Sequence, residues 1–195
     1  DGQTIQLNVT PTRAGFSFAG WVSQSGTNYA AAATTSITAT NYIFYASWVA
    51  NSYTITFAAG AGSNGNASAI TDSYGATVQL ASSSGYSLDG SKFTGWLIGS
   101  TTYPAGALYV MGADASPITA TAQFTNNTFK VFYNTNGATA GTTPVATAAV
   151  QGASISLNDA TGFSRSGFTF EGWSDGTDIR AAGYATTMGS TNTTV

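Results

Sequence analysis

The chain has 195 residues, of which only 7% are charged, and its formal net charge is −3. Its five basic residues are scattered singly, so there is no basic patch for nucleic acid or for an anionic membrane surface. Cysteine and histidine are both absent, which excludes disulfides, thiolate metal sites, and the commonest general base and metal ligand.

The remaining composition favours a folded, mainly β protein. Hydrophobic residues make up 43% of the chain and aromatic residues 13%, which is enough to build cores. Threonine and aromatic residues favour strands, glycine, asparagine and serine favour turns, and strong helix formers are scarce. No apolar run is long enough to span a membrane, so we expect no membrane insertion.

One short phrase of alternating polar and apolar residues occurs three times. Residues 1–7 (DGQTIQL) return as residues 74–80 (YGATVQL) and as residues 151–157 (QGASISL). Each copy predicts a strand that begins after a glycine turn and places two aliphatic side chains toward a core.

A second phrase follows each copy of the first. It reads GFSFAGW at 15–21, DGSKFTGW at 89–96 and GFTFEGW at 167–173. The tryptophans lie 75 and 77 residues apart (96 − 21 and 173 − 96), so the chain is an internal repeat of about 75 residues. The alternation of aromatic with small or polar residues predicts a strand with one aromatic face.

In the first two repeats the tryptophan is followed by a polar loop and then by a strand that ends in an aromatic residue. Residues 43–48 (IFYASW) and 118–124 (ITATAQF) are these closing strands. New strands open at 53–57 (YTITF) and 129–133 (FKVFY), and each runs into a Gly/Asn-rich turn. Asn-Gly favours hairpin turns because both residues tolerate positive φ.

The order of these phrases divides the chain into residues 1–49, a partial repeat that lacks its first strand, 50–125, a complete repeat, and 126–195, a repeat that lacks its last strand. Incomplete repeats leave unpaired strand edges at residues 1–49 and 126–195. We therefore expect partners of the same kind: neighbouring repeats, or other subunits that donate a strand.

The order and recurrence of these phrases, with the Tyr-Ala-Ser-Trp at 45–48, resemble the Listeria–Bacteroides repeat, or internalin B-repeat, family. The resemblance implies small β-grasp-like units, α+β at most, in an elongated array. It also implies an extracellular bacterial surface protein that acts as stalk, spacer or filament-forming module with a possible adhesion role. It implies no catalytic residues and no cofactor, and the chain is expected not to be an enzyme.

The recurring aromatic residues are predicted to form the structural core of the repeats. This set is Phe16, Phe18, Trp21, Trp48, Phe93, Trp96, Phe124, Phe168, Phe170 and Trp173. The alternative is a glycan- or host-receptor-binding module in which tryptophan faces, or Tyr29, Tyr103 and Tyr184, stack on sugars. One tryptophan at the same place in every repeat favours the core.

Other candidate sites have weaker support. Asp175 and Asp178 lie close in sequence, which suits a solvated turn better than weak Ca²⁺ binding. Lys92 and Lys130 raise the question of an internal crosslink to Asn or Asp, but the counterpart of Lys130 is Thr54 and carboxylates that could assist the reaction are few. Four Asn-x-Ser/Thr sequons begin at Asn8, Asn66, Asn126 and Asn192, as expected by chance in a chain of this composition.

Overall fold

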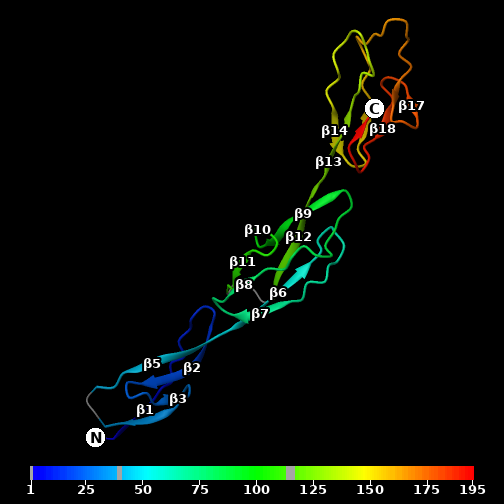
Figure 1. Cartoon of the computed structure of the whole chain (residues 1–195). Coiled ribbons are helices and arrows are strands. Elements are labelled where there is room, and N and C mark those ends of the chain that lie inside the picture. Colours follow the sequence, from blue (N-terminus) through cyan, green and yellow to red (C-terminus); the bar gives the residue numbers. More distant parts are fainter. Residues whose placement is uncertain (1, 39–40, 113–116) are drawn as a thin grey trace. The chain divides into compact units, whose positions relative to one another are not determined.

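The computed structural model describes residues 2–38, 41–112 and 117–195, and these residues form strands, turns and loops without a helix. They make up two compact units. Figure 1 shows the ribbon of the whole chain. The first unit comprises Asp1–Gly60, Asn64–Tyr86 and Gly95–Gln123, and the second comprises Ala61–Ser63, Ser87–Thr94 and Phe124–Val195. The fold is therefore all-β and repeated, as predicted.

The strands of residues 1–126 form four sheets. A two-stranded ladder pairs β1 with β4, and a second pairs β8 with β11. The larger sheets have the orders β3-β2-β5 and β10-β9-β12-β6-β7. The bounds are β1 Gln3–Gln6, β2 Phe16–Ser23, β3 Asn28–Tyr29, β4 Thr34–Ile37, β5 Phe44–Ala50, β6 Ser52–Ala58, β7 Ile70–Ser73, β8 Thr77–Gln79, β9 Ser91–Ile98, β10 Thr101–Tyr103, β11 Leu108–Val110 and β12 Ile118–Asn126.

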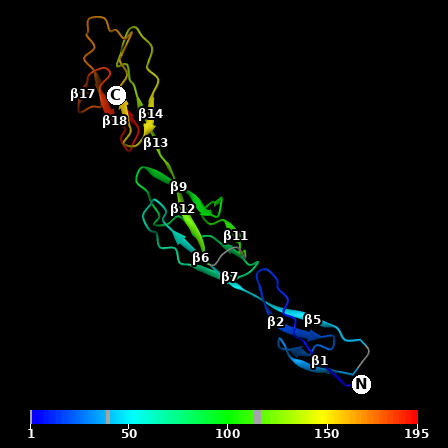
Figure 2. The ribbon, with the colours of Figure 1, turned by 180° about the vertical axis from the view of Figure 1, so that it is seen from behind.

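The strands after β12 repeat this plan. A ladder pairs β15 with β18, a short hairpin pairs β16 with β17, and a three-stranded sheet has the order β14-β13-β19. Figure 2 labels β13, β14, β17 and β18 of this part of the chain. The bounds are β13 Thr128–Phe132, β14 Thr147–Val150, β15 Ser154–Ser156, β16 Trp173–Ser174, β17 Ile179–Arg180, β18 Ala185–Thr187 and β19 Thr193–Thr194.

The three copies of the first sequence phrase form the same structure each time. They give β1, β8 and β15, which pair antiparallel with β4, β11 and β18. In the second and third repeats the aliphatic residue at the end of the phrase is buried, with Leu80 and Leu157 2% and 5% exposed. The recurrence of the phrase therefore reflects one ladder that is built three times.

The first and last strands of a repeat are parallel neighbours. In the second repeat β6 pairs with β12 in parallel, with Ile55 opposite Ile118 and Ala58 opposite Thr121. Figure 1 shows the two strands side by side and pointing the same way. In the third repeat β13 pairs with β19 in parallel, with Val131 opposite Thr193.

A tryptophan lies at the centre of the core in the second and third repeats. Trp96 is 0% exposed, and the rings of Phe57 and Tyr86 meet it edge-on at centroid distances of 4.8 Å each. Tyr133 and Phe163 surround Trp173 in the same way at 4.7 and 5.8 Å. Edge-to-face packing suits the quadrupoles of aromatic rings and fixes the orientation of the central one.

A methionine completes each of these two cores. Met111 and Met188 are 0% and 3% exposed, and each follows the last strand of a two-stranded ladder. Met188 belongs to the same buried cluster as Trp173, where an unbranched thioether suits an irregular space. Their separation (188 − 111 = 77) equals that of the two tryptophans, so the methionine recurs at the same place in the sequence of both repeats.

The glycine before each tryptophan is required by a close backbone approach. A Cβ on Gly95 would lie 2.5 Å from the carbonyl oxygen of Tyr103 on the adjacent strand β10. A Cβ on Gly20 or Gly172 would likewise overlap the carbonyl oxygen of Tyr29 or Arg180. The Gly-Trp pair thus lets the following hairpin strand lie directly against the tryptophan strand.

The predicted Asn-Gly turn is absent at Asn64 and Gly65, neither of which has positive φ. It forms at Asn136 and Gly137, but it does not make a tight hairpin there. Asn136 and Gly137 have φ of 45° and 79°, as such a turn requires. The partner of β13 is β14, however, which begins only at Thr147. The intervening loop crosses to residues 164–165 instead, where Thr139 and Ala140 donate to the carbonyl oxygen of Ser164.

Candidate functional site

The candidate site is a surface of the third repeat that no strand covers in the part of the chain that the structure describes. In the first repeat β5 runs antiparallel to β2 and places Trp48 opposite Phe18. In the second repeat β12 lies beside β9. In the third repeat residues 169–172 belong to no strand, and only Trp173 and Ser174 remain paired as β16.

This difference leaves aromatic rings at the surface. Phe18 and Phe93 are half-buried against the closing-strand rings of Trp48 and Phe124, at centroid distances of 5.6 and 5.8 Å. Their equivalent in the third repeat is Phe170, which is 43% exposed.

The prediction that Phe168 and Phe170 belong to the core therefore needs correction. Phe168 is 65% exposed and Phe170 is 43% exposed, because no strand among the described residues covers them. The other residues of the predicted core set are buried or half-buried. Trp96 and Trp173 are buried, whereas Phe16, Phe18, Trp21, Trp48, Phe93 and Phe124 are half-buried.

The uncovered surface is a groove of about 860 Å³. We call it the third-repeat groove. Its apolar lining includes Phe163, Phe168, Phe170, Trp173, Ile179 and Val195. Polar residues around them include Arg165, Glu171 and Asp175. The groove thus presents an aromatic floor beside residues 169–172, which belong to no strand.

An arginine holds one side of the groove in position. The Arg165 guanidinium lies 4.2 Å from the ring centroid of Phe168, and its Nη1 donates to the carbonyl oxygen of Asn136 at 3.2 Å. Arg13 lies over Phe16 in the same way at 4.0 Å in the first repeat. This cation–π pair orients Phe168 without a covering strand.

In the second and third repeats the tryptophan, a candidate sugar-stacking residue, exposes no ring face to solvent. The indole nitrogens of Trp96 and Trp173 donate to the carbonyl oxygens of Ala81 and Asn158, at 2.8 and 2.7 Å. Trp21 is half-buried, and its Nε1 is buried without a hydrogen-bond partner. The first repeat therefore carries a less complete version of the same core.

The three tyrosines that are candidates for stacking on a ligand differ in exposure. Tyr29 and Tyr103 are half-buried and pack edge-on against Phe44 and Tyr109. Tyr184 is 43% exposed, and the Arg180 guanidinium lies 5.1 Å from its ring centroid.

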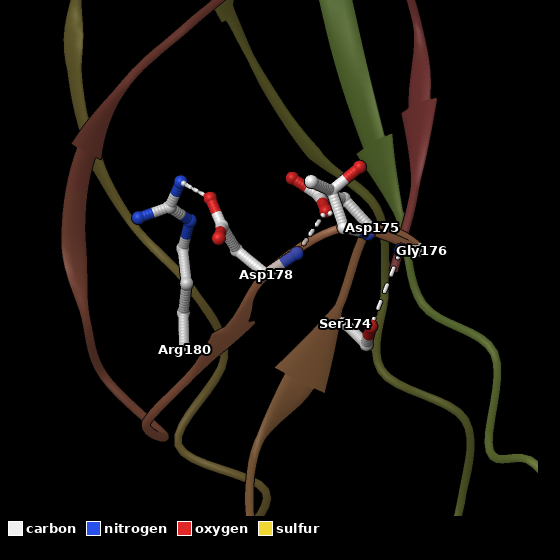
Figure 3. Close-up of polar contacts among 6 residues, drawn as sticks. Ser174, Asp175, Gly176, Asp178 and Arg180 are labelled. Atoms are coloured by element: carbon white, nitrogen blue, oxygen red, sulfur yellow. Dashed lines mark hydrogen bonds and ion pairs between the residues drawn. The ribbon is translucent and has the colours of Figure 1, made fainter.

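The Asp175–Asp178 loop is a hairpin turn that satisfies its own acidic groups (Figure 3). Oδ1 of Asp175 accepts from the backbone N–H groups of Thr177 and Asp178, both at 2.9 Å. Oδ2 of Asp178 pairs with Arg180 Nη2 at 3.0 Å. Within residues 2–38, 41–112 and 117–195 no group of three or more acidic residues could hold a metal ion.

We expect Asp175 to titrate at lower pH in the folded chain than when unfolded. The backbone N–H groups of Asp178 and Thr177, with the charge of Arg180, lower the pKa of this carboxyl below 3.8. Its stabilising contribution is therefore present above the unfolded pKa and is lost as pH falls through the folded one. An NMR titration of the Asp175 carboxyl measures this midpoint.

The control for this titration is Asp175→Asn, which keeps an oxygen acceptor for the turn but removes the charge. The variant should keep the turn. Because its side chain does not titrate, the destabilisation by acid that comes from Asp175 should be absent. A folded-state midpoint at or above 3.8 would show that the turn does not hold the carboxylate.

The other candidates lie on the surface. Lys92 and Lys130 are both exposed. The side chain of Asn192 accepts from the backbone N–H of Lys130 at 2.9 Å, so this sequon residue helps to fix β19 beside β13. No helix in the described part of the chain is long and apolar enough to cross a membrane.

These features define an all-β protein of tandem repeats. The model of the Listeria-Bacteroides repeat domain matches residues 1–47, 53–115 and 129–195. The chain belongs to the Listeria-Bacteroides repeat family, a repeat family of bacterial surface proteins.

A relative of the chain is a protein of Evansella cellulosilytica that bears the name "Putative membrane protein". The two are 27% identical over 172 residues, which is 88% of this chain and 25% of the relative. The chain thus spans about a quarter of the length of that protein. No solved structure matches the chain.

Proposed function

We propose that the chain is a stalk or spacer segment of an extracellular, surface-located bacterial protein, and that its repeats carry tension along the polypeptide. The repeats bury separate aromatic cores built from the same sequence positions. Such chains gain stability from each unit and from its contacts with the next. No enzymatic activity is part of this proposal.

The observation that carries the proposal is the parallel pairing of the first and last strands of a repeat. Tension enters the second repeat at the start of β6 and leaves at the end of β12. Because these strands are parallel neighbours, their loaded ends lie at opposite ends of the shared ladder. Separation then requires all the ladder hydrogen bonds to break together, rather than one after another.

The joints between repeats also suit this role. A single residue, Asn51, separates β5 from β6, so the chain passes directly from one closing strand to the next opening strand. The Asn51 N–H donates to the carbonyl oxygen of Gly15 at 2.9 Å, and its carbonyl accepts from Tyr74 N–H at 2.8 Å. Asn127 donates to the Gly90 carbonyl oxygen in the same way at 2.7 Å.

At each of these joints a side chain of the next repeat packs over a turn glycine. The ring of Tyr74 lies against Gly15 and meets Phe16 edge-on at 5.3 Å. Gln151 takes the equivalent place against Gly90. Short linkers and repeated packing favour a spacer over a flexible tether.

Single-molecule force spectroscopy of the chain held at its two ends tests the proposal. We expect discrete unfolding events, because each core must shear before its repeat extends. Smooth extension without such events would contradict a tension-carrying role.

A further inference from the structure

We propose that Asn64 is a site of spontaneous deamidation, and that the fold protects the other Asn-Gly pair of the chain from the same reaction. The two pairs are Asn64-Gly65 and Asn136-Gly137. Glycine favours this chemistry because it has no side chain to hinder its backbone nitrogen. The two pairs are alike in sequence, and the structure distinguishes them. The reaction is independent of any role in carrying tension.

The reaction needs only water and hydroxide. Hydroxide takes the proton from the glycine N–H, and the nitrogen attacks Cγ of the asparagine side chain. A Cγ–N bond forms, the Cγ–Nδ2 bond breaks, and ammonia leaves with a proton from water, which regenerates hydroxide. Water then opens the five-membered imide at either carbonyl group. One product is aspartate, and the other is isoaspartate, in which the main chain runs through Cβ and Cγ.

The turn at Asn136 holds the reacting atoms apart. Asn136 and Gly137 have φ of 45° and 79°, as in a type I′ turn, and the Ala138 N–H closes the turn on the Thr135 carbonyl oxygen at 3.0 Å. In this left-handed conformation the next backbone nitrogen lies nearly opposite Cβ across the Cα–C bond. Cγ of Asn136 therefore reaches the nitrogen of Gly137 only after the peptide rotates and the turn opens.

Two further hydrogen bonds restrain this turn. The Asn136 N–H donates to Oδ1 of Asn134 at 2.9 Å, and the Asn136 carbonyl oxygen accepts from Nη1 of Arg165 at 3.2 Å. These bonds hold the peptide groups on both sides of Asn136, so each adds to the cost of opening the turn. Asn136 is exposed, so its protection comes from conformation and not from burial.

Asn64 has none of these restraints. Neither Asn64 nor Gly65 has positive φ, and neither belongs to a strand or a turn. Among the residues that the structure describes, neither of the two has a hydrogen-bond partner. The Asn64 side chain is exposed, so Cγ can approach the nitrogen of Gly65 without breaking a contact.

A product at Asn64 bears on the core of the second repeat. The Gly65 backbone lies against Tyr86, since a Cβ on Gly65 would lie 2.2 Å from two carbons of that ring. Tyr86 is 7% exposed and meets Trp96 edge-on at 4.8 Å. Isoaspartate lengthens the main chain by one carbon directly before Gly65, so we expect it to displace this contact. Aspartate adds only a negative charge.

The test is timed incubation of the full chain in mildly alkaline buffer, followed by digestion after lysine and arginine and by mass spectrometry. This digestion places the two pairs on different peptides, residues 14–92 and 131–165. We expect Asn64 to deamidate about tenfold faster than Asn136 or more, since imide closure at Asn136 first breaks several hydrogen bonds. In strong denaturant the two rates should become similar. Equal rates in the folded chain, no reaction at Asn64, or the same difference in denaturant would overturn the proposal.

Two variants complete the test. Asn134→Ala removes the acceptor of the Asn136 N–H from an exposed position, so it should speed deamidation at Asn136 and leave the rate at Asn64 unchanged. An unchanged rate at Asn136 would contradict protection by the turn. Asn64→Asp reproduces the charge without the longer main chain, so the isoaspartate form, separated by chromatography, should unfold at a lower denaturant concentration than this variant. Equal midpoints would contradict the displacement of Tyr86.

Discussion

Trp96→Ala is expected to unfold much of the second repeat. Trp96 is 0% exposed and is held between Phe57 and Tyr86. Truncation of a buried aromatic residue of this kind costs about 3–5 kcal/mol. That is a large part of the stability of a small domain. Denaturant unfolding followed by amide exchange should show loss of protection at Ile55 and Met111.

The control for this prediction compares Trp96→Phe with Trp21→Phe, which change equivalent positions in two repeats. Trp96→Phe keeps a ring but leaves the Ala81 carbonyl oxygen without its 2.8 Å donor, at a cost of about 1–3 kcal/mol. Trp21→Phe removes an indole nitrogen that is buried without a partner, so it should cost less. If Trp96→Ala destabilised the chain by less than about 1 kcal/mol, Trp96 would not be the centre of this core.

Gly95→Ala is expected to destabilise the second repeat by about 3 kcal/mol, the upper end of the range for overpacking. The new Cβ would lie 2.5 Å from the Tyr103 carbonyl oxygen. Since this atom belongs to backbone, strand β10 would have to move away from Trp96. Thermal or denaturant unfolding measures the loss of stability.

Gly99→Asn is the matched control in the same hairpin. Gly99 has φ of 58° and no atom within 4 Å of its ideal Cβ position. Asparagine tolerates this conformation, so the variant should cost less than about 1 kcal/mol. Similar losses at both positions would mean that the close approach to Tyr103 does not explain the glycine.

The sequence was sufficient to predict what depends on local pattern. The alternation around Ile5, Val78 and Ile155 predicts the strands that the structure contains, β1, β8 and β15. The recurrence of Gly-Trp marks the positions of the core tryptophans, because a core built repeatedly reuses the same residues. The family resemblance is confirmed by matches that cover most of the chain.

The remaining features depend on contacts between segments that are distant in sequence. The need for glycine before tryptophan becomes visible only once the carbonyl of Tyr103 is placed beside it. The exposure of Phe168 and Phe170 depends on whether a neighbouring strand is present, and periodicity alone does not show this. The partner of β13 is likewise set by a long loop and not by the Asn-Gly turn.

The most direct test of the account compares two pulling geometries within one repeat. The chain has no cysteine, so introduced cysteines give unique handles. Handles at Ser52→Cys and Thr125→Cys load β6 and β12 in shear, whereas Ser52→Cys with Pro117→Cys pulls apart the adjacent starts of the same two strands. We predict a clearly higher unfolding force for the first pair. Equal forces, or a lower force in shear, would contradict the claim that parallel terminal strands carry tension through the repeat.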